Sequence, residues 1–203
     1  MARPLTPKLS PELIARAALA MVDAKGEFTV PELAKRLKVS PSSLYNHVTG
    51  KGDIIELMRG AAVAQIDLAG VTAGDPHWSA AIRGIAVQYR NSYAVHPRLI
   101  PLLTAYSVRD ATTIGMYNVL AEQFARAGFT PARTLEAITV LDNYVLGSAL
   151  DVAAPEDVWD PGETAGPSLR AALDAGLGRA ERADEAFLFG LDLIMAGFER
   201  LAP

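Results

Sequence analysis

The sequence predicts an all-α protein in which a small N-terminal head of three helices precedes a larger helical body. Apolar residues recur at three- and four-residue spacing along most of the chain, and no alternating pattern typical of a β-strand is visible. Proline stands at or beside the start of most of these periodic segments, a position that favours helix initiation. We place the head at residues 1–50 and the body at residues 51–203, connected by a helix over residues 51–70.

Charge divides the chain at nearly the same point. Residues 1–60 contain nine Lys and Arg against six Asp and Glu, whereas residues 61–203 contain ten Arg against seventeen acidic residues. A basic head on an acidic body indicates that the head binds a polyanion. The alternative is a chance distribution in an arginine-rich sequence.

The first helix of the head is predicted from Ser10 to Gly26. Ser10 can cap the helix N-terminus, Pro11 fits the first helical position, and Gly26 suits the left-handed residue that ends a helix. Between these ends the apolar residues form one stripe at helical spacing: Leu13, Ile14, Ala17, Ala18, Met21 and Val22. The stripe predicts that this helix packs against the rest of the head.

The second and third helices are predicted to form a helix-turn-helix. Thr29 and Glu32 have the spacing of a capping box, which predicts the start of the second helix. Ser40 and Pro41 predict the start of a third helix that ends near His47. A helix this short is not stable in isolation, so its apolar side must be clamped against its neighbours. In DNA-binding proteins the second helix of such a motif enters the major groove.

The body is predicted to consist of longer helices. The connecting helix begins near Lys51 and continues to about Gly70. The remaining helices are predicted over residues 77–94, 97–105, 110–127, 132–152, 167–178 and 183–201. An acidic segment rich in Pro and Gly lies between Leu150 and Pro167, and we expect it to form a long loop. No apolar run is long enough to span a membrane.

The segment FTVPELAKRLKVSPSSLYNHVTGKGDIIELM, residues 28–58, has Leu-Ala-x-x-Leu-x-Val, then Leu-Tyr-x-His-Val, then Lys before a helix. With these features the head resembles the DNA-binding head of the tetracycline repressor (TetR) family. In the body, GFTPARTLEAITVLDNYVLGSALD and AFLFGLDLIMAGFERL resemble the tetracycline-repressor branch itself. The resemblance implies an all-helical homodimer that binds double-stranded operator DNA and represses transcription until a small-molecule inducer binds the body.

The resemblance assigns the polar side of the third helix and its flanks to DNA. The implied DNA-binding residues are Thr29, Pro41, Ser42, Ser43, Tyr45, Asn46, His47 and Lys51. Ser42 and Ser43 would reach base edges or phosphates, and Tyr45 and Lys51 would bind backbone phosphates. The alternative for each is a solvated surface residue or a helix cap. Pro31 stands where the tetracycline repressor reads a guanine with an arginine, so we expect a different operator.

The resemblance also implies an inducer site inside the body. The candidate lining residues are Val63, Asp67, Ile85, Tyr89, Leu103, Tyr106, Met116, Leu120, Asn143 and Asp151. Aromatic residues on helices are more often part of a core than of a ligand site, and in this family some of them can be both.

We expect an inducer other than magnesium-chelated tetracycline. The tetracycline repressor holds the metal with a histidine, whose position falls on Leu103 or Thr104 here, and neither is a good divalent ligand. Ile85 and Leu120 stand where an asparagine and a glutamine bind the drug, although an acid is kept as Asp151. Burying a polar chelate among apolar groups would leave its oxygens unsatisfied, at about 1–3 kcal/mol each.

The sequence shows no pattern typical of an enzyme. There is no cysteine, which excludes disulfides, thiolate metal sites and cysteine nucleophiles. His47, His77 and His96 lack metal-binding spacing, and Glu136 and Asp142 are interpreted as solvated or interface acids. We expect no catalytic residue, metal or cofactor, and a cytoplasmic location. The alternative is a helical small-molecule-binding protein or enzyme with an attached DNA-binding head.

The last helix and the helix over residues 132–152 are predicted to mediate dimerisation. One stripe of the last helix is apolar: Phe187, Leu188, Leu191, Ile194, Met195 and Phe198. The candidate partner face contains Leu135, Ile138, Tyr144, Val145, Ser148 and Val152. Two helices from each chain would make a four-helix bundle. The alternative is that both faces pack inside a monomer.

Overall fold

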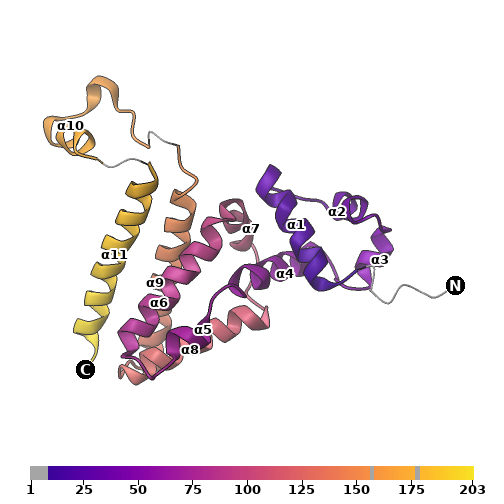
Figure 1. The fold of residues 1–203 in the computed structure, drawn as a ribbon, viewed down its shortest axis with the longest axis horizontal. Helices are drawn as coiled ribbons and strands as arrows, with labels where there is room; N and C mark the ends of the chain where they lie inside the picture. Colours follow the sequence, from indigo (N-terminus) through magenta and orange to yellow (C-terminus); the bar gives the residue numbers. More distant parts are fainter. Residues whose placement is uncertain (1–8, 156–157, 177–178) are drawn as a thin grey trace.

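The computed structural model describes residues 9–155, 158–176 and 179–203. In this part of the chain every regular element is a helix, which confirms the predicted all-α fold. The first three helices lie at one end of an elongated molecule, and the C-terminal helix lies at the other (Figure 1). None of the described helices is long and apolar enough to cross a membrane.

The N-terminal helices follow the predicted caps. They are α1 (Pro11–Lys25), α2 (Val30–Leu37), α3 (Pro41–Tyr45) and α4 (Lys51–Val63). The Ser10 side chain accepts the N–H of Leu13 at 3.2 Å, and Gly26 ends α1 in the left-handed region with φ of 82°. Helix α1 packs against both α2 and α4, and α2 packs against α3. Helix α4 therefore connects the head to the body, as the ribbon shows (Figure 1).

The predicted connecting helix over residues 51–70 is wrong in its second half. Helix α4 ends at Val63, and a separate short helix, α5 (Leu68–Thr72), follows it. The backbone N–H of Asp67 donates to the Gln88 side chain of another helix at 2.7 Å, so it is not available to α4. The Asp67 carboxylate instead caps the start of α5.

The body is built around one central helix. Its main helices are α6 (Trp78–Ala94), α8 (Ala111–Arg126), α9 (Pro131–Asp151), α10 (Pro167–Asp174) and α11 (Arg179–Leu201). Helix α6 packs against α4, α8, α9 and α11. The predicted loop before α10 contains a short 3-10 helix, η2 (Gly162–Thr164). Helix α10 ends before its predicted limit, and residues 177–178 lie outside the described residues, whereas α11 begins four residues earlier than predicted.

The single helix predicted over residues 97–105 is also wrong. The chain forms a 3-10 helix, η1 (Pro97–Leu99), followed by α7 (Ile100–Leu103). The Arg59 guanidinium donates to the Leu103 carbonyl at 3.2 Å, which satisfies a carbonyl at the end of α7 and allows the helix to stop there.

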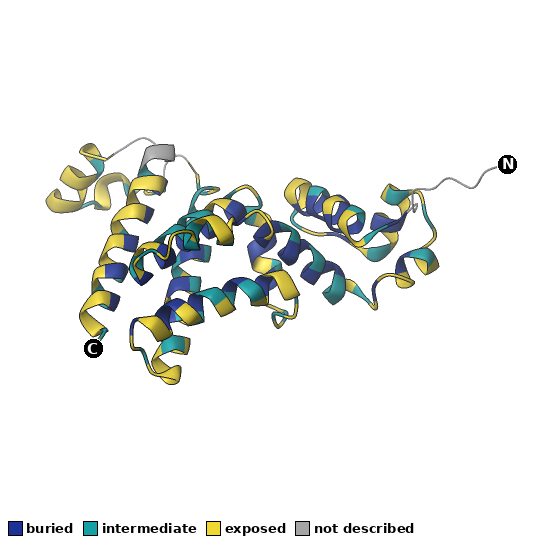
Figure 2. Ribbon diagram, turned by 60° about the horizontal axis from the view of Figure 1, so that its bottom comes forward, coloured by how far each residue is buried: buried dark blue, intermediate teal, exposed yellow. Residues whose placement is uncertain are grey.

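One hydrophobic core runs through the whole molecule. The same cluster of buried residues extends from Leu33 and Leu44 in the head, through Ile55 of α4, to Leu191 of α11. Buried residues line the inner faces of the helices along the full length of the ribbon (Figure 2). The head is therefore not packed independently of the body.

Candidate functional site

Helix α3 is held in place by a cap and by its buried leucine. The Ser40 hydroxyl accepts the N–H of Ser43 at 3.2 Å and lies 2.8 and 2.9 Å from the hydroxyls of Ser42 and Ser43. Leu44 is completely buried. Lys38 takes the left-handed conformation, with φ of 56°, and makes the tight turn between α2 and α3. These contacts form the predicted helix-turn-helix.

The predicted DNA-binding side chains on this motif point outward. Tyr45 is 53% exposed and Ser43 is half-buried, while the other predicted residues on and after α3 are exposed. Helix α3 ends at Tyr45 rather than near His47, so its predicted end is wrong. Asn46 and His47 lie in the following turn, where the Leu44 carbonyl accepts the N–H of His47 at 2.9 Å.

Thr29 and Lys51 flank α3 at the starts of two other helices. Thr29 forms the predicted capping box: its hydroxyl accepts the N–H of Glu32, and the Glu32 carboxylate accepts the N–H of Thr29 at 3.1 Å. The Lys51 ammonium lies 5.2 Å from the centroid of the Phe28 ring, in a cation–π contact that orients an exposed side chain. Both residues are accessible to a polyanion.

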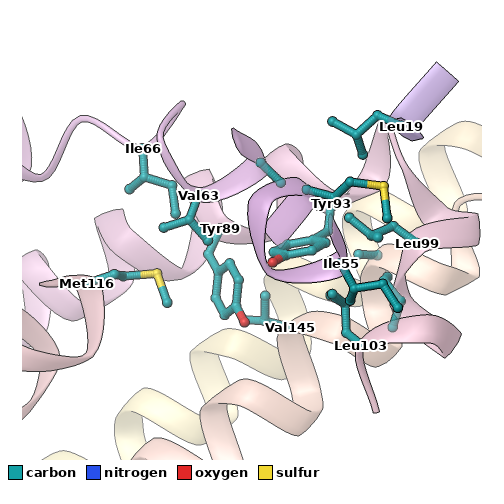
Figure 3. Packing of buried hydrophobic residues seen from close by; sticks show 14 of the residues in the cluster. Leu19, Ile55, Val63, Ile66, Tyr89, Tyr93, Leu99, Leu103, Met116 and Val145 are labelled. Carbon is teal, nitrogen blue, oxygen red and sulfur yellow. The ribbon is translucent and has the colours of Figure 1, made fainter. Parts of the chain in front are cut away.

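Six of the ten predicted inducer-binding residues are buried in the hydrophobic core. Each is at most 4% exposed: Val63, Ile85, Tyr89, Leu103, Met116 and Leu120. Figure 3 shows Tyr89 in one cluster with Val63, Met116 and Val145, which come from three other helices. All six are thus part of the hydrophobic core, on α4, α6, α7 and α8.

The other four predicted inducer-binding residues lie elsewhere. Asp67 is exposed at the start of α5, and Tyr106 is half-buried, with its ring against Gly52 of α4. Asn143 and Asp151 line a pocket of about 320 Å³ between α9 and α11. Within one chain the predicted set is thus divided between an apolar core and separate surface positions.

Asp142, interpreted from the sequence as a solvated or interface acid, is partly buried and binds two tyrosines of the body. Its Oδ1 atom accepts the hydroxyl of Tyr89 at 2.8 Å and the hydroxyl of Tyr117 at 2.7 Å. Burial, followed by the charge of Asp142, raises the pKa of both tyrosines well above the ordinary value. Both phenols therefore remain protonated donors. No sequence spacing indicates this cluster, because α6, α8 and α9 each contribute one residue.

A second polar cluster joins α4 to the segment between α7 and α8. Glu56 Oε1 lies 2.8 Å from Arg59 Nε, and both side chains are less than one tenth exposed. Glu56 Oε2 accepts the backbone N–H groups of Arg109 at 2.5 Å and Asp110 at 2.9 Å. Burial alone would raise the pKa of Glu56, but the hydrogen bonds from Arg109, Arg59 and Asp110 outweigh it and leave this pKa below the ordinary value.

Arg59 extends the same cluster toward the predicted inducer site. Its guanidinium donates to the carbonyls of Leu103 at 3.2 Å and Tyr106 at 3.1 Å. Both are predicted inducer-binding residues, and α4 begins at the predicted phosphate contact Lys51. The cluster therefore joins α4 to the end of α7 and to the segment before α8.

The end of α1 is also bound to the body. The imidazole of His96 lies 3.0 Å from the Asp23 carboxylate, and Arg98 donates to the carbonyls of Asp23 and Ala24 at 3.1 and 2.7 Å. A groove of about 670 Å³ lies beside this contact, between α1, α4 and the start of α8. These contacts join the end of α1 to His96 and to η1.

Most of the apolar stripe of α11 that was predicted to mediate dimerisation is buried within its own chain. Phe187, Leu191, Met195 and Phe198 are at most 7% exposed, because they pack inside their own chain against the rest of the body. Val145, predicted on the partner face of α9, is likewise completely buried. Placing these five residues at a dimer interface is therefore wrong.

Other apolar residues of α9 and α11 point to solvent in the single chain. On α11, Phe189 is 68% exposed and Leu193 is 59% exposed. Leu135 and Val140 of α9 are 68% and 49% exposed. The outer face of α11 is exposed along its length in Figure 2. Both helices thus expose large apolar side chains in the single chain.

The described residues contain no group of three or more His, Asp or Glu side chains that could hold a metal ion.

Comparison with known proteins gives the family. Residues 72–202 match the tetracyclin repressor-like, C-terminal domain. An HTH-type transcriptional regulator of Saccharopolyspora erythraea is 31% identical to this chain over 91% of it and 75% of the relative. The class G tetracycline repressor protein of Vibrio anguillarum is 26% identical over 96% of this chain and 95% of the relative.

Solved structures of other repressor-like regulators share this fold. Apo ActR from Streptomyces coelicolor has a TM-score of 0.77 and 18% identity, covering 97% of this chain and 98% of that one. TetR from Acinetobacter baumannii has a TM-score of 0.71 and 25% identity, covering 96% of this chain and 98% of that one. The chain therefore belongs to the tetracycline repressor (TetR) family of ligand-responsive, DNA-binding transcriptional repressors.

Proposed function

We propose that this repressor binds its operator as a homodimer through α3 and leaves it when a small molecule binds inside the body. The observation that carries the DNA-binding part is the exposure of α3. A helix of five residues is stabilised by buried Leu44 and a serine cap, yet it presents Tyr45 and its polar neighbours to solvent. Acting on operator DNA would place the protein in the cytoplasm.

The roles of the exposed side chains follow from their positions. Pro41, Ser42 and Ser43 open α3 and would meet base edges in the major groove, where Asn46 and His47 follow. Tyr45, Thr29 and Lys51 would bind the phosphates on either side. Ser42 and Ser43 would exchange their hydrogen bonds to the Ser40 hydroxyl for bonds to DNA.

Two copies would associate through the exposed apolar face of α9 and α11. Leu135 and Val140 of one chain and Phe189 and Leu193 of the other supply side chains that a four-helix bundle buries. The two-fold axis would then place two copies of α3 on successive turns of the major groove. Residues 1–50 form the DNA-binding domain in this arrangement, and residues 51–203 form the domain that binds inducer and dimerises.

The inducer would bind among the six buried residues that α4, α6, α7 and α8 bring together. Ile85, Leu103 and Leu120 make this interior apolar, which disfavours magnesium-chelated tetracycline. Inducer binding would displace α7, and the Glu56–Arg59 cluster would transmit that displacement to α4. Catalysis has no part in this mechanism, and no metal or cofactor is required.

The test is fluorescence anisotropy with labelled duplex DNA from the region upstream of the gene, combined with sedimentation velocity. We expect salt-dependent binding by a dimer, unaffected by tetracycline with magnesium. Leu193→Glu should give a monomer with weak DNA binding, whereas Val95→Glu, at an exposed position on another surface, should remain dimeric. A wild-type monomer, or affinity for the upstream duplex no greater than for random duplex, would refute the proposal.

A further inference from the structure

Asp142 carries a negative charge that no described cation neutralises. Its hydrogen-bond partners are the hydroxyls of Tyr89 and Tyr117, which are neutral, and it makes no ion pair with a described Lys, Arg or His. Arg59, whose charge lowers the pKa of Tyr117, is itself paired with Glu56. The two carboxylates of the interior thus differ, since Glu56 has a bound guanidinium and Asp142 has none.

Only one of the two oxygens of Asp142 is occupied. Both phenols donate to Oδ1, at 2.8 and 2.7 Å, whereas Oδ2 makes no hydrogen bond with any described residue. Oδ2 is not fully enclosed by protein atoms, and the Asp142 side chain is only partly buried. Oδ2 is therefore an accessible acceptor, although Tyr89 beside it is 3% exposed.

The two tyrosines hold the carboxylate in one orientation. Because both hydrogen bonds end on Oδ1, they hold this oxygen in place and leave Oδ2 without a hydrogen bond to a described residue. A protonated donor that reaches Oδ2 would form a charge-assisted hydrogen bond, which is stronger than a hydrogen bond between neutral groups.

We propose that Asp142 binds the inducer and that the inducer carries a protonated amine, which donates a hydrogen bond to Oδ2. The inference rests on the proposed function, because it names the chemical class of the ligand at that site. The apolar part of the ligand lies against Tyr89, Met116 and Leu120, and the amine occupies the polar edge at Asp142 and Tyr117.

The experiment compares two probes of the same shape by calorimetric titration at neutral pH. The probes are 1-naphthylmethylamine, which is protonated, and 1-naphthylmethanol, which is neutral. We expect the wild-type chain to bind the amine roughly 10- to 100-fold more tightly, the contribution of one charge-assisted hydrogen bond. Equal affinity for the two probes, or no binding of the amine, overturns the inference.

Asp142→Asn tests the residue itself. The asparagine carbonyl oxygen can accept both tyrosine hydroxyls, so the variant keeps the cluster and loses only the charge. We expect it to bind both probes with equal affinity, and a retained preference for the amine overturns the inference. The matched control is Glu122→Gln, which removes the same charge from the exposed side of α8 and should keep the preference.

Two further measurements test the inference even if Asp142→Asn fails to fold. The comparison of the two probes on the wild-type chain needs no variant. Tyr117→Phe removes one donor and keeps the Asp142 charge, so the preference for the amine must persist, and its loss counts against the inference. DNA binding is measured separately by anisotropy, so a repressor that binds its operator but does not distinguish the probes refutes the amine and leaves the proposed function intact.

Discussion

The head and the body are stabilised by interactions of different range. In the head, each helix start is capped by a residue three positions away: Ser10 for Leu13, Thr29 for Glu32, and Ser40 for Ser43. In the body, the decisive polar contacts join residues far apart in the chain, 53 positions for Tyr89 with Asp142 and 54 for Asp110 with Glu56. The comparison teaches that the helix starts of the head depend on neighbouring residues, whereas the polar contacts of the body form only when its helices pack.

The largest expected effect comes from breaking the buried cluster of the body. Arg59→Ala would leave Glu56 as an uncompensated buried charge and free two carbonyls, so we expect the free energy of unfolding to fall by about 3–5 kcal/mol. Urea denaturation followed by circular dichroism measures it. The exposed pair of Arg133 with Glu136 is the control, and Arg133→Ala should cost less than about 0.5 kcal/mol. If both variants lost the same free energy of unfolding, the Glu56–Arg59 cluster would not be the stronger support of the fold.

Acid should weaken the same cluster by protonating Glu56. The pKa of this carboxyl is lower in the folded chain than in the unfolded chain, so its stabilisation is complete above the ordinary value of 4.5 and is lost as pH falls through the folded pKa. We expect Glu56→Gln to be less stable near neutral pH but to lose less stability than wild type as the pH falls below about 4.5. Urea denaturation at several pH values measures the free energy of unfolding of both proteins. If it fell equally in wild type and in Glu56→Gln, protonation of Glu56 would not be the cause.

Removing a cap from the head should have a smaller effect. Ser40→Ala deletes the acceptor for the N–H of Ser43 and should destabilise the chain by about 1 kcal/mol. DNA affinity should fall as well, because α3 has no other side-chain cap at its start. Ser42→Ala is the matched control: it leaves the cap intact, so it should change DNA affinity with little change in the urea midpoint. If Ser42→Ala lost as much stability as Ser40→Ala, the Ser40 cap would not be what stabilises the start of α3.

The smallest expected effect is that of a single phosphate contact. Lys51→Ala should weaken binding to all DNA sequences alike and reduce the slope of log affinity against log salt by about one unit. Lys35→Ala, at an exposed position of α2 outside the predicted contact set, should leave the slope nearly unchanged. Anisotropy titrations at several salt concentrations distinguish them, and an unchanged slope in Lys51→Ala would place this residue outside the interface.

The predictions from sequence succeeded where the information is local. The caps at Ser10, Thr29 and Ser40 set the helix starts of the head, and the periodicity of the apolar residues gave the positions of the long helices. They failed where a distant residue intervenes. The Gln88 side chain accepts the N–H of Asp67, in the segment where the connecting helix was predicted to continue, and Arg59 donates to the carbonyl of Leu103 at the end of α7.

The sequence by itself determined the helical class, the helix-turn-helix and the exposed polar face of α3, because capping and helical periodicity depend on residues a few positions apart. Only the tertiary structure decided which apolar residues of α11 face inward. Phe187 and Phe189 are equally apolar in the sequence, yet one is 3% and the other 68% exposed. It also decided that Asp142 meets Tyr89 and Tyr117, since a contact between three helices depends on their packing and not on spacing along any one of them.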